Sequence, residues 1–150
     1  MKWKDEVALV TGASRGIGRA IALALGAEGA HVIINYRSNK ELAEGVKGSI
    51  QKAGGRSETI AFDVANPEET QNAISQILKD KKKISILVNN AGIVKDNLLL
   101  RYSLEDWNQV LDTNLRGAFI TSQAVIRSMI KERKGSIIHV SSVAGVVGNP

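Results

Sequence analysis

Several residue types are scarce in this sequence of 150 residues, and each scarcity excludes a class of structure or chemistry. The chain has no cysteine, which excludes disulfides, thiolate metal sites and a cysteine nucleophile and fits a reducing, cytoplasmic setting. The longest stretch without a polar side chain spans residues 20–27, too short for a membrane helix of about 20 residues. No apolar segment follows the charged start Met1-Lys2-Trp3, so we expect no secretory signal.

Aromatic residues and histidines are also few, with two each of Trp, Tyr, Phe and His. The spread of the aromatics offers no stacking platform for nucleic-acid bases. His31 and His139 stand in separate predicted strands, so no metal site is predicted, and Trp3 and Trp107 are expected to be apolar anchors. The formal net charge of +5 comes largely from residues 79–83 and 131–134. Both clusters end predicted helices, where cations complement the helix dipole; an acidic partner's site is the alternative.

Short apolar segments alternate with helical ones along the whole chain. The predicted strands are residues 7–11, 31–36, 56–62, 84–89 and 135–141. The predicted helices are residues 19–28, 40–53, 66–82 and 103–133, the last with a break near Asn114. Such alternation is typical of βαβ units, whose right-handed crossovers give a parallel sheet with helices on both faces. The sequence therefore predicts the α/β class.

The first predicted strand ends in the glycine-rich segment T-G-A-S-R-G-I-G, residues 11–18. Gly12 would make a tight turn, Gly16 would let the backbone approach a phosphate, and Gly18 would allow close helix–strand packing. The generic dinucleotide spacing is not met because Ile21 stands where a third glycine belongs, and no P-loop lysine follows. A phosphate-binding turn is predicted, with a simple tight turn as the alternative.

The second predicted strand ends in Asn35-Tyr36-Arg37, where NAD-binding domains carry an acidic residue for the ribose hydroxyl. No acid is present here. Arg37 replaces it, and Arg15 in the glycine-rich segment could reach the same point. Two guanidinium groups suit a 2′-phosphate, so the arrangement favours NADP(H) over NAD. The alternative is two ordinary surface arginines.

Several segments along the chain together match the motifs of one protein family. The sequence resembles the short-chain dehydrogenase/reductase family, and within it the 3-oxoacyl-acyl-carrier-protein reductases of fatty-acid synthesis. The matching segments, in order along the chain, are T-G-A-S-R-G-I-G, I-N-Y-R-S, F-D-V (62–64), N-N-A-G (89–92), D-T-N-L (112–115), I-I-H-V-S-S-V-A-G (137–145) and V-V-G-N (146–149).

The resemblance implies a Rossmann-like doubly wound fold with strand order 3-2-1-4-5, a single NAD(P)-binding domain over residues 1–150, and specific residue roles. The cofactor-binding residues would be Gly12, Ser14, Arg15, Gly16, Ile17, Gly18, Arg37, Asp63, Val64, Asn90, Ala91 and Gly92. Among these, Asp63 and Val64 would hold the adenine. Asn114, at a helix irregularity, would fix a water of a proton relay, and Ser142 would hydrogen-bond the substrate carbonyl. Leu98–Leu100 would border the substrate cleft in this family, although core packing is the simpler prediction.

One role of the family has no match in these residues. Its general acid is a tyrosine, with a lysine four positions later, roughly a dozen residues after the serine. Tyr36 and Lys40 share that spacing by coincidence, at the adenosine end of the site, and Tyr102 has Asp106 at the lysine position. We therefore expect a chain truncated after the fifth strand, covering roughly the first three fifths of such a protein.

The favoured function is NADPH-dependent reduction of 3-oxoacyl-carrier thioesters, with this chain as the cofactor-binding part. One alternative is a non-catalytic NADP-binding or interaction module, and another is a short-chain reductase for a different carbonyl substrate. A fragment that does not fold stably is a further alternative. The resemblance also implies an acyl carrier protein as partner and, for the full-length family, a homo-oligomer. The composition and the short apolar runs predict neither nucleic-acid nor membrane partners.

Overall fold

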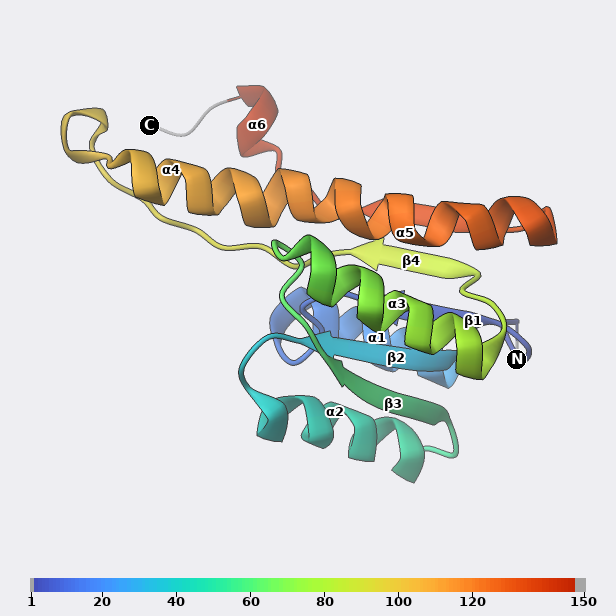
Figure 1. Ribbon diagram of the computed structural model, residues 1–150. Helices are drawn as coiled ribbons and strands as arrows, with labels where there is room; N and C mark the ends of the chain where they lie inside the picture. The colour runs from blue at the N-terminus through green and yellow to red at the C-terminus, as the bar shows by residue number, and fades with distance from the viewer. Residues whose placement is uncertain (1, 148–150) are drawn as a thin grey trace.

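A computed structural model describes residues 2–147 and contains a five-stranded sheet in which all neighbouring strands are parallel (Figure 1). The strands are β1 (Val7–Val10), β2 (His31–Tyr36), β3 (Arg56–Ala61), β4 (Ile86–Asn89) and β5 (Ser136–His139). Their order is β3-β2-β1-β4-β5. The predicted class, parallel sheet and strand order are therefore confirmed.

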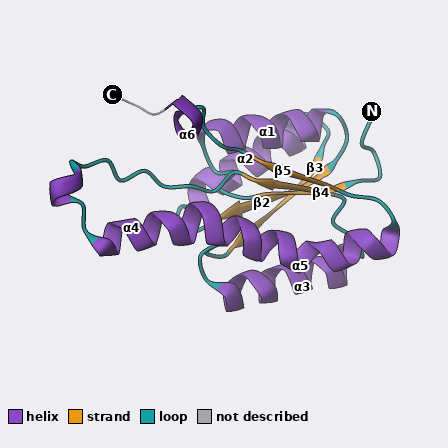
Figure 2. Ribbon diagram, turned by 90° about the horizontal axis from the view of Figure 1, so that it is seen from above, coloured by secondary structure: helices purple, strands orange, loops and turns teal. Residues whose placement is uncertain are grey.

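Helices connect successive strands and cover both faces of the sheet. They are α1 (Gly16–Ala27), α2 (Lys40–Lys52), α3 (Pro67–Lys81), α4 (Leu104–Leu111) and α5 (Gly117–Glu132), with a short α6 (Ala144–Val147) after β5. A 3-10 turn, η1 (Leu99–Arg101), precedes α4, and a π-helical segment, η2 (Asp112–Arg116), joins α4 to α5. Figure 2 shows α1 and α2 on one face of the sheet and α3 and α5 on the other. This arrangement is a doubly wound fold.

The helix boundaries follow from capping side chains. Asn39 accepts a hydrogen bond from the Leu42 N–H, and Asn66 accepts from the N–H groups of Glu68 and Glu69. Ser103 accepts from the Asp106 N–H at 3.0 Å and donates its O–H to the Asp106 carboxylate at 2.9 Å, which caps the first turn of α4. The helices therefore begin where the sequence places polar N-caps.

Predicted and observed boundaries differ mainly at two places. The prediction that the first helix starts at residue 19 is wrong, because Gly16 and the residues after it already form the first turn of α1. The prediction that the fourth strand starts at residue 84 is also wrong. Ser85 donates its N–H to Val7 at 2.9 Å but precedes the regular ladder, which pairs Ala8 with Ile86. The other ends shift by one or two residues, as is usual where ladders and helices fray.

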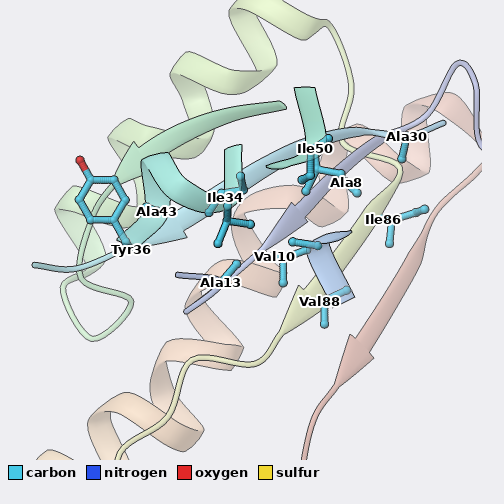
Figure 3. Close-up of a cluster of buried hydrophobic side chains, with 13 residues drawn as sticks. Ala8, Val10, Ala13, Ala30, Ile34, Tyr36, Ala43, Ile50, Ile86 and Val88 are labelled. Atoms are coloured by element: carbon cyan, nitrogen blue, oxygen red, sulfur yellow. The ribbon is translucent and has the colours of Figure 1, made fainter. Parts of the chain in front are cut away.

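Two large apolar clusters fill the space between the sheet and its helices, and a third, smaller one contains Phe62, Val64 and Ala73. In β1, Ala8 and Val10 belong to the cluster beneath α1 and α2, whereas Val7 and Leu9 belong to the one beneath α3 and α5. This alternation is the period of two expected of a strand covered on both faces. Figure 3 shows the first cluster, which runs along β1, β2 and β4 to Tyr36 at its end.

Two predictions about apolar residues are wrong. Leu98, Leu99 and Leu100 are 68%, 93% and 94% exposed, so they do not pack in the core. Trp107 is 53% exposed on α4 and anchors nothing there, whereas Trp3 is half-buried against the first cluster. The three leucines lie in the segment that leaves the sheet after β4 and extends away from it before α4, and Trp107 lies in α4 itself (Figure 1). Within the described residues, no helix combines the length and apolar character needed to cross a membrane.

Candidate functional site

The carboxyl ends of β1, β2, β3 and β4 border a cleft of about 600 Å³. It lies where the chain order reverses between β1 and β4, the switch point at which doubly wound sheets bind ligands. Its lining residues are Gly12, Ser14, Arg15, Gly16, Ile17, Asn35, Tyr36, Arg37, Ser38, Asn39, Leu42, Phe62, Asp63, Val64, Asn90, Ala91, Gly92, Ile93 and Thr113. All the predicted cofactor-binding residues except Gly18 are in this set.

In the glycine-rich turn after β1, two backbone φ angles have values that residues other than glycine adopt only with strain. Gly12 has φ +61° and Gly16 has φ +55°, both in the left-handed region. A Cβ on Gly12 would lie 2.9 Å from the Ala91 Cα, so the turn packs directly against the loop after β4. A Cβ on Gly18 would lie 2.4 Å from the Asn90 Nδ2 and 2.5 Å from the Gly12 oxygen. Gly18 therefore acts behind the cleft wall, through the close packing predicted for it.

The N-terminus of α1 faces this cleft without a negative group of its own. Its N-cap residue, Arg15, makes no capping hydrogen bond, and its first turn contains no acidic residue. The first turns of α2, α3 and α4 all contain acidic side chains and have capped N-termini. The N–H groups at the start of α1 and the helix dipole therefore suit an anionic ligand.

Hydrogen bonds join the turn after β1 to the loop after β4. The Thr11 hydroxyl accepts from the N–H groups of Asn90 and Ala91, each at 3.0 Å, and donates to the Val88 carbonyl at 3.3 Å. The Asn90 side chain donates to the carbonyls of Thr11 at 3.0 Å and Gly12 at 3.2 Å. Asn90 therefore holds the two loops at the switch point together.

The far end of the cleft carries the predicted arginines and a carboxylate. Arg37 follows β2 directly, and its guanidinium lies 3.7 Å from the Asp63 carboxylate. Asp63 also accepts from the Ala65 N–H at 2.9 Å, which fixes its orientation. Arg15 lines the same cleft from the glycine-rich turn. Two arginines and one carboxylate thus line the cleft.

The comparison with protein families identifies the chain. The family model described as short chain dehydrogenase matches residues 6–150. The chain belongs to the short-chain dehydrogenase family. This result agrees with the fold, the glycine-rich turn and the switch-point cleft.

Individual relatives agree with this assignment. The chain is 48% identical over 145 residues to the 3-oxoacyl-acyl-carrier-protein reductase of Synechocystis sp., a match that covers 97% of the chain and 59% of the relative. It is 48% identical over 143 residues to the reductase of that name from Staphylococcus aureus, covering 95% and 58% respectively. The chain thus spans about three fifths of the length of these curated relatives.

A solved structure of a metagenomic short-chain oxidoreductase in complex with NADP superposes with a TM-score of 0.94 at 34% identity. The match covers 100% of this chain and 67% of that one.

The two residues that the resemblance assigned to catalysis lie outside the cleft lining of this short-chain dehydrogenase chain. Asn114 stands in η2, at the predicted helix irregularity, and its amide bonds both the N–H and the carbonyl of Ile93, at 2.8 and 2.9 Å. Ser142 is exposed after β5, and its hydroxyl oxygen accepts from the Ala144 N–H at 3.2 Å. Their roles toward a substrate stay predictions. Residues 148 and 149 of the V-V-G-N segment lie outside the described residues.

Sequence reasoning missed several polar residues of the site. Asn35 and Thr11 are buried at 2% and 1% exposure, yet both bond the cleft loops. The available signal was a polar side chain at the carboxyl end of an otherwise apolar strand, at the edge where ligands bind. Ser38 and Asn39 also line the cleft, as do the apolar Leu42, Phe62 and Ile93.

Proposed function

We propose that the cleft binds NADPH and that the chain is the cofactor-binding part of a reductase of 3-oxoacyl-carrier thioesters. The observation that carries the cofactor assignment is the pair Arg15 and Arg37 at the cleft, with no acidic residue directly after β2. The substrate assignment depends on the names of the relatives that are 46–48% identical over nearly the whole chain.

The residues of the cleft suit this cofactor. The backbone at Gly12 and Gly16 and the start of α1 would receive the pyrophosphate, because no side chain blocks the approach. Arg15 and Arg37 would bind the 2′-phosphate, for which guanidinium groups offer paired N–H donors. Asp63 would hold the adenine together with Val64 and keep Arg37 oriented through their ion pair. Asn90, Ala91 and Gly92 would line the path toward the nicotinamide.

In the proposed reaction NADPH supplies a hydride to the β-ketone of the substrate. Ser142 would donate its hydroxyl proton in a hydrogen bond to the substrate carbonyl, since that hydroxyl uses only an acceptor position for Ala144. Asn114 would support the proton path from η2. A tyrosine activated by a nearby lysine, following Ser142 in the sequence, would be the general acid.

The test of the cofactor assignment is a fluorescence titration of the chain with NADPH and with NADH. We expect NADPH to bind at least tenfold more tightly, because two charge-assisted contacts to a phosphate are each worth about 1.5–3 kcal/mol. We also expect this preference to weaken as salt is added. Equal affinity for the two nucleotides would contradict the assignment.

Two alternatives are tested with other substrates and readouts. A short-chain reductase for a different carbonyl would bind NADPH equally well. Only turnover of different carbonyl substrates by a form of the protein that contains a general acid distinguishes it. A non-catalytic NADP-binding module would bind NADPH and give no turnover with any acyl thioester in such a form.

A further inference from the structure

Asn35, the penultimate residue of β2, is a polar side chain buried to 2% exposure beside the cleft. Its side-chain oxygen accepts from the Gly12 N–H at 3.1 Å. Its side-chain nitrogen donates to the carbonyls of Phe62 at 3.0 Å and Tyr36 at 3.3 Å. Because all three partners are backbone groups, the amide has only one orientation that satisfies them. Both of its N–H protons therefore have acceptors.

The three partners belong to three different segments of the cleft wall. Gly12 lies in the turn after β1, Tyr36 ends β2, and Phe62 follows β3. Backbone hydrogen bonds reinforce the same junction: Ala13 donates to the Asn35 carbonyl at 2.9 Å, and Phe62 donates to the Tyr36 carbonyl at 3.1 Å. One buried amide thus joins the turn after β1 to both strand ends on its side of the cleft.

The segments that Asn35 joins also carry the charged residues of the cleft. Arg37 directly follows Tyr36, and Asp63 directly follows Phe62. The distance between the glycine-rich turn and the Arg37–Asp63 pair therefore depends on the Asn35 amide. On its other side the turn lies close to Ala91, since a Cβ on Gly12 would come within 2.9 Å of the Ala91 Cα.

We propose that Asn35 is a positioning residue for nucleotide binding, an inference that rests on the proposed NADPH site. Asn35 holds the phosphate-binding turn and Arg37, which would bind the 2′-phosphate, at the separation that one nucleotide spans. Asn35 acts through Gly12, Tyr36 and Phe62, because it is almost fully buried.

Physical chemistry explains why an amide is needed at this position. A leucine, which has the same branching but no polar atoms, would leave the Gly12 N–H and the Phe62 carbonyl without this partner in a buried place, which costs more than the bond itself contributes. An ionised aspartate would keep the bond to Gly12 but would face two carbonyl oxygens with a negative charge. Only a group that both accepts and donates satisfies all three neighbours.

The experiment compares Asn35→Leu with Val125→Ala by NADPH titration and thermal unfolding. Val125 is fully buried in the cluster beneath α3 and α5 and does not line the cleft, so its truncation destabilises the chain without touching the cleft. We expect Asn35→Leu to raise the Kd for NADPH by roughly tenfold, and Val125→Ala to change it by less than about twofold. Wild-type affinity in Asn35→Leu, or an equal loss in both variants at matched stability, would overturn the proposal.

Asn35→Asp provides a second test if Asn35→Leu does not fold. Burial raises the pKa of the introduced carboxyl, and its protonated form regains one donor toward Phe62 or Tyr36. The Kd of this variant, divided by that of the wild type at each pH, should therefore fall as pH is lowered from about 8 to about 5. A ratio independent of pH would overturn the proposal.

The wild-type titration separates the two levels of inference. If the wild type does not bind NADPH, the proposed function fails. If the wild type binds and the Asn35 variants bind equally well, only the role of Asn35 fails.

Discussion

At the scale of single residues, the proposed preference for NADPH depends on the side chain that follows β2. Arg37 is 61% exposed as a side chain and lies 3.7 Å from the Asp63 carboxylate. An ion pair this exposed contributes little to stability. Arg37 is therefore available to a ligand, and its substitution should change binding far more than folding.

Arg37→Asp is expected to remove the preference for NADPH. The change deletes a phosphate-binding group and introduces a carboxylate that repels the 2′-phosphate and can accept from a ribose hydroxyl. We expect the Kd for NADPH to rise by roughly 10- to 100-fold, while the Kd for NADH stays equal or falls. Arg127→Asp, the same charge change on exposed α5, is the control. An NADPH preference retained by Arg37→Asp would refute the role of Arg37.

Glu6 is a buried carboxylate at the opposite edge of the sheet from the cleft. It hydrogen-bonds Lys134, and its second oxygen lies 3.4 Å from the Lys83 ammonium. The hydrogen bond from Lys134 is the largest influence, followed by the Ser85 side chain and then the charge of Lys83, and together they lower the pKa of Glu6 to about 2. The pair joins the start of β1 to the segment after α5, across 128 residues of sequence.

The Glu6 contacts should make stability depend on pH in the acid range. A carboxyl with a lowered pKa in the folded state stabilises the fold above its unfolded pKa and loses that contribution as pH falls toward its folded value. We expect Glu6→Gln to lower the free energy of unfolding by about 2 kcal/mol at neutral pH. The difference from wild type should shrink between about pH 4.5 and pH 2.

Urea unfolding at several pH values measures this effect. Glu132→Gln, an exposed carboxylate of the same region with no ion pair among residues 2–147, is the matched control and should change stability little at any pH. A Glu6→Gln difference that is constant from neutral pH to pH 2 would show that the charge of Glu6 is not responsible.

At the scale of elements, glycines with different surroundings should respond oppositely to the same substitution. Gly18 lies in the first turn of α1, pressed against Asn90 and the Gly12 carbonyl. Gly45 lies inside α2, where an added Cβ would meet nothing within 4 Å. The first glycine is required by packing between a helix and two loops, and the second has no steric requirement.

Gly18→Ala should destabilise the chain by about 1–3 kcal/mol, because the new methyl group must displace the Asn90 amide and the turn. Gly45→Ala should stabilise it by about 0.5–1 kcal/mol, since alanine has the higher helix propensity. Chemical denaturation gives both values, and NADPH titration should show weaker binding only for Gly18→Ala. Equal stability changes in the two variants would contradict this packing model.

The helical region after the exposed loop shows what sequence patterns can and cannot predict about an element. A break near Asn114 was predictable, and η2 occupies Asp112–Arg116. Its π-helical form was not predictable from local pattern, and neither was the contact of Asn114 with the backbone of Ile93, 21 residues earlier. Likewise, Leu98–Leu100 are apolar in sequence and exposed in the structure, since no element of the described residues covers them.

At the scale of the whole molecule, strand order decides which residues can act together. β2 and β5 are separated by β1 and β4, which places them roughly 14 Å apart at the spacing of sheet strands. Tyr36 ends β2, whereas Ser142 follows β5. Tyr36 and Lys40, despite their spacing in sequence, therefore cannot protonate a carbonyl held by Ser142.

The 150-residue chain is accordingly expected to bind NADPH but to reduce an acetoacetyl thioester slowly or not at all. General acid catalysis contributes about 10²–10⁴-fold to such reactions, and neither Tyr36 nor Tyr102 follows Ser142. A stopped assay with NADPH measures turnover, and a parallel titration shows that the nucleotide is bound. Ordinary turnover by this chain would contradict the prediction.

The sequence by itself determined the alternation of strands and helices, a parallel sheet covered on both faces and the glycine-rich turn. These features depend on local periodicity, capping residues and glycine positions, all of which act between near neighbours in the chain. The strand order and most of the cleft lining were expected only from the resemblance of the sequence motifs to a known family. Only the tertiary structure decided the contacts of Asn35 with Gly12 and Phe62, of Glu6 with Lys134, and of Asn114 with Ile93. Each joins residues far apart in sequence, and the pairing of such groups depends on how the strands and helices pack.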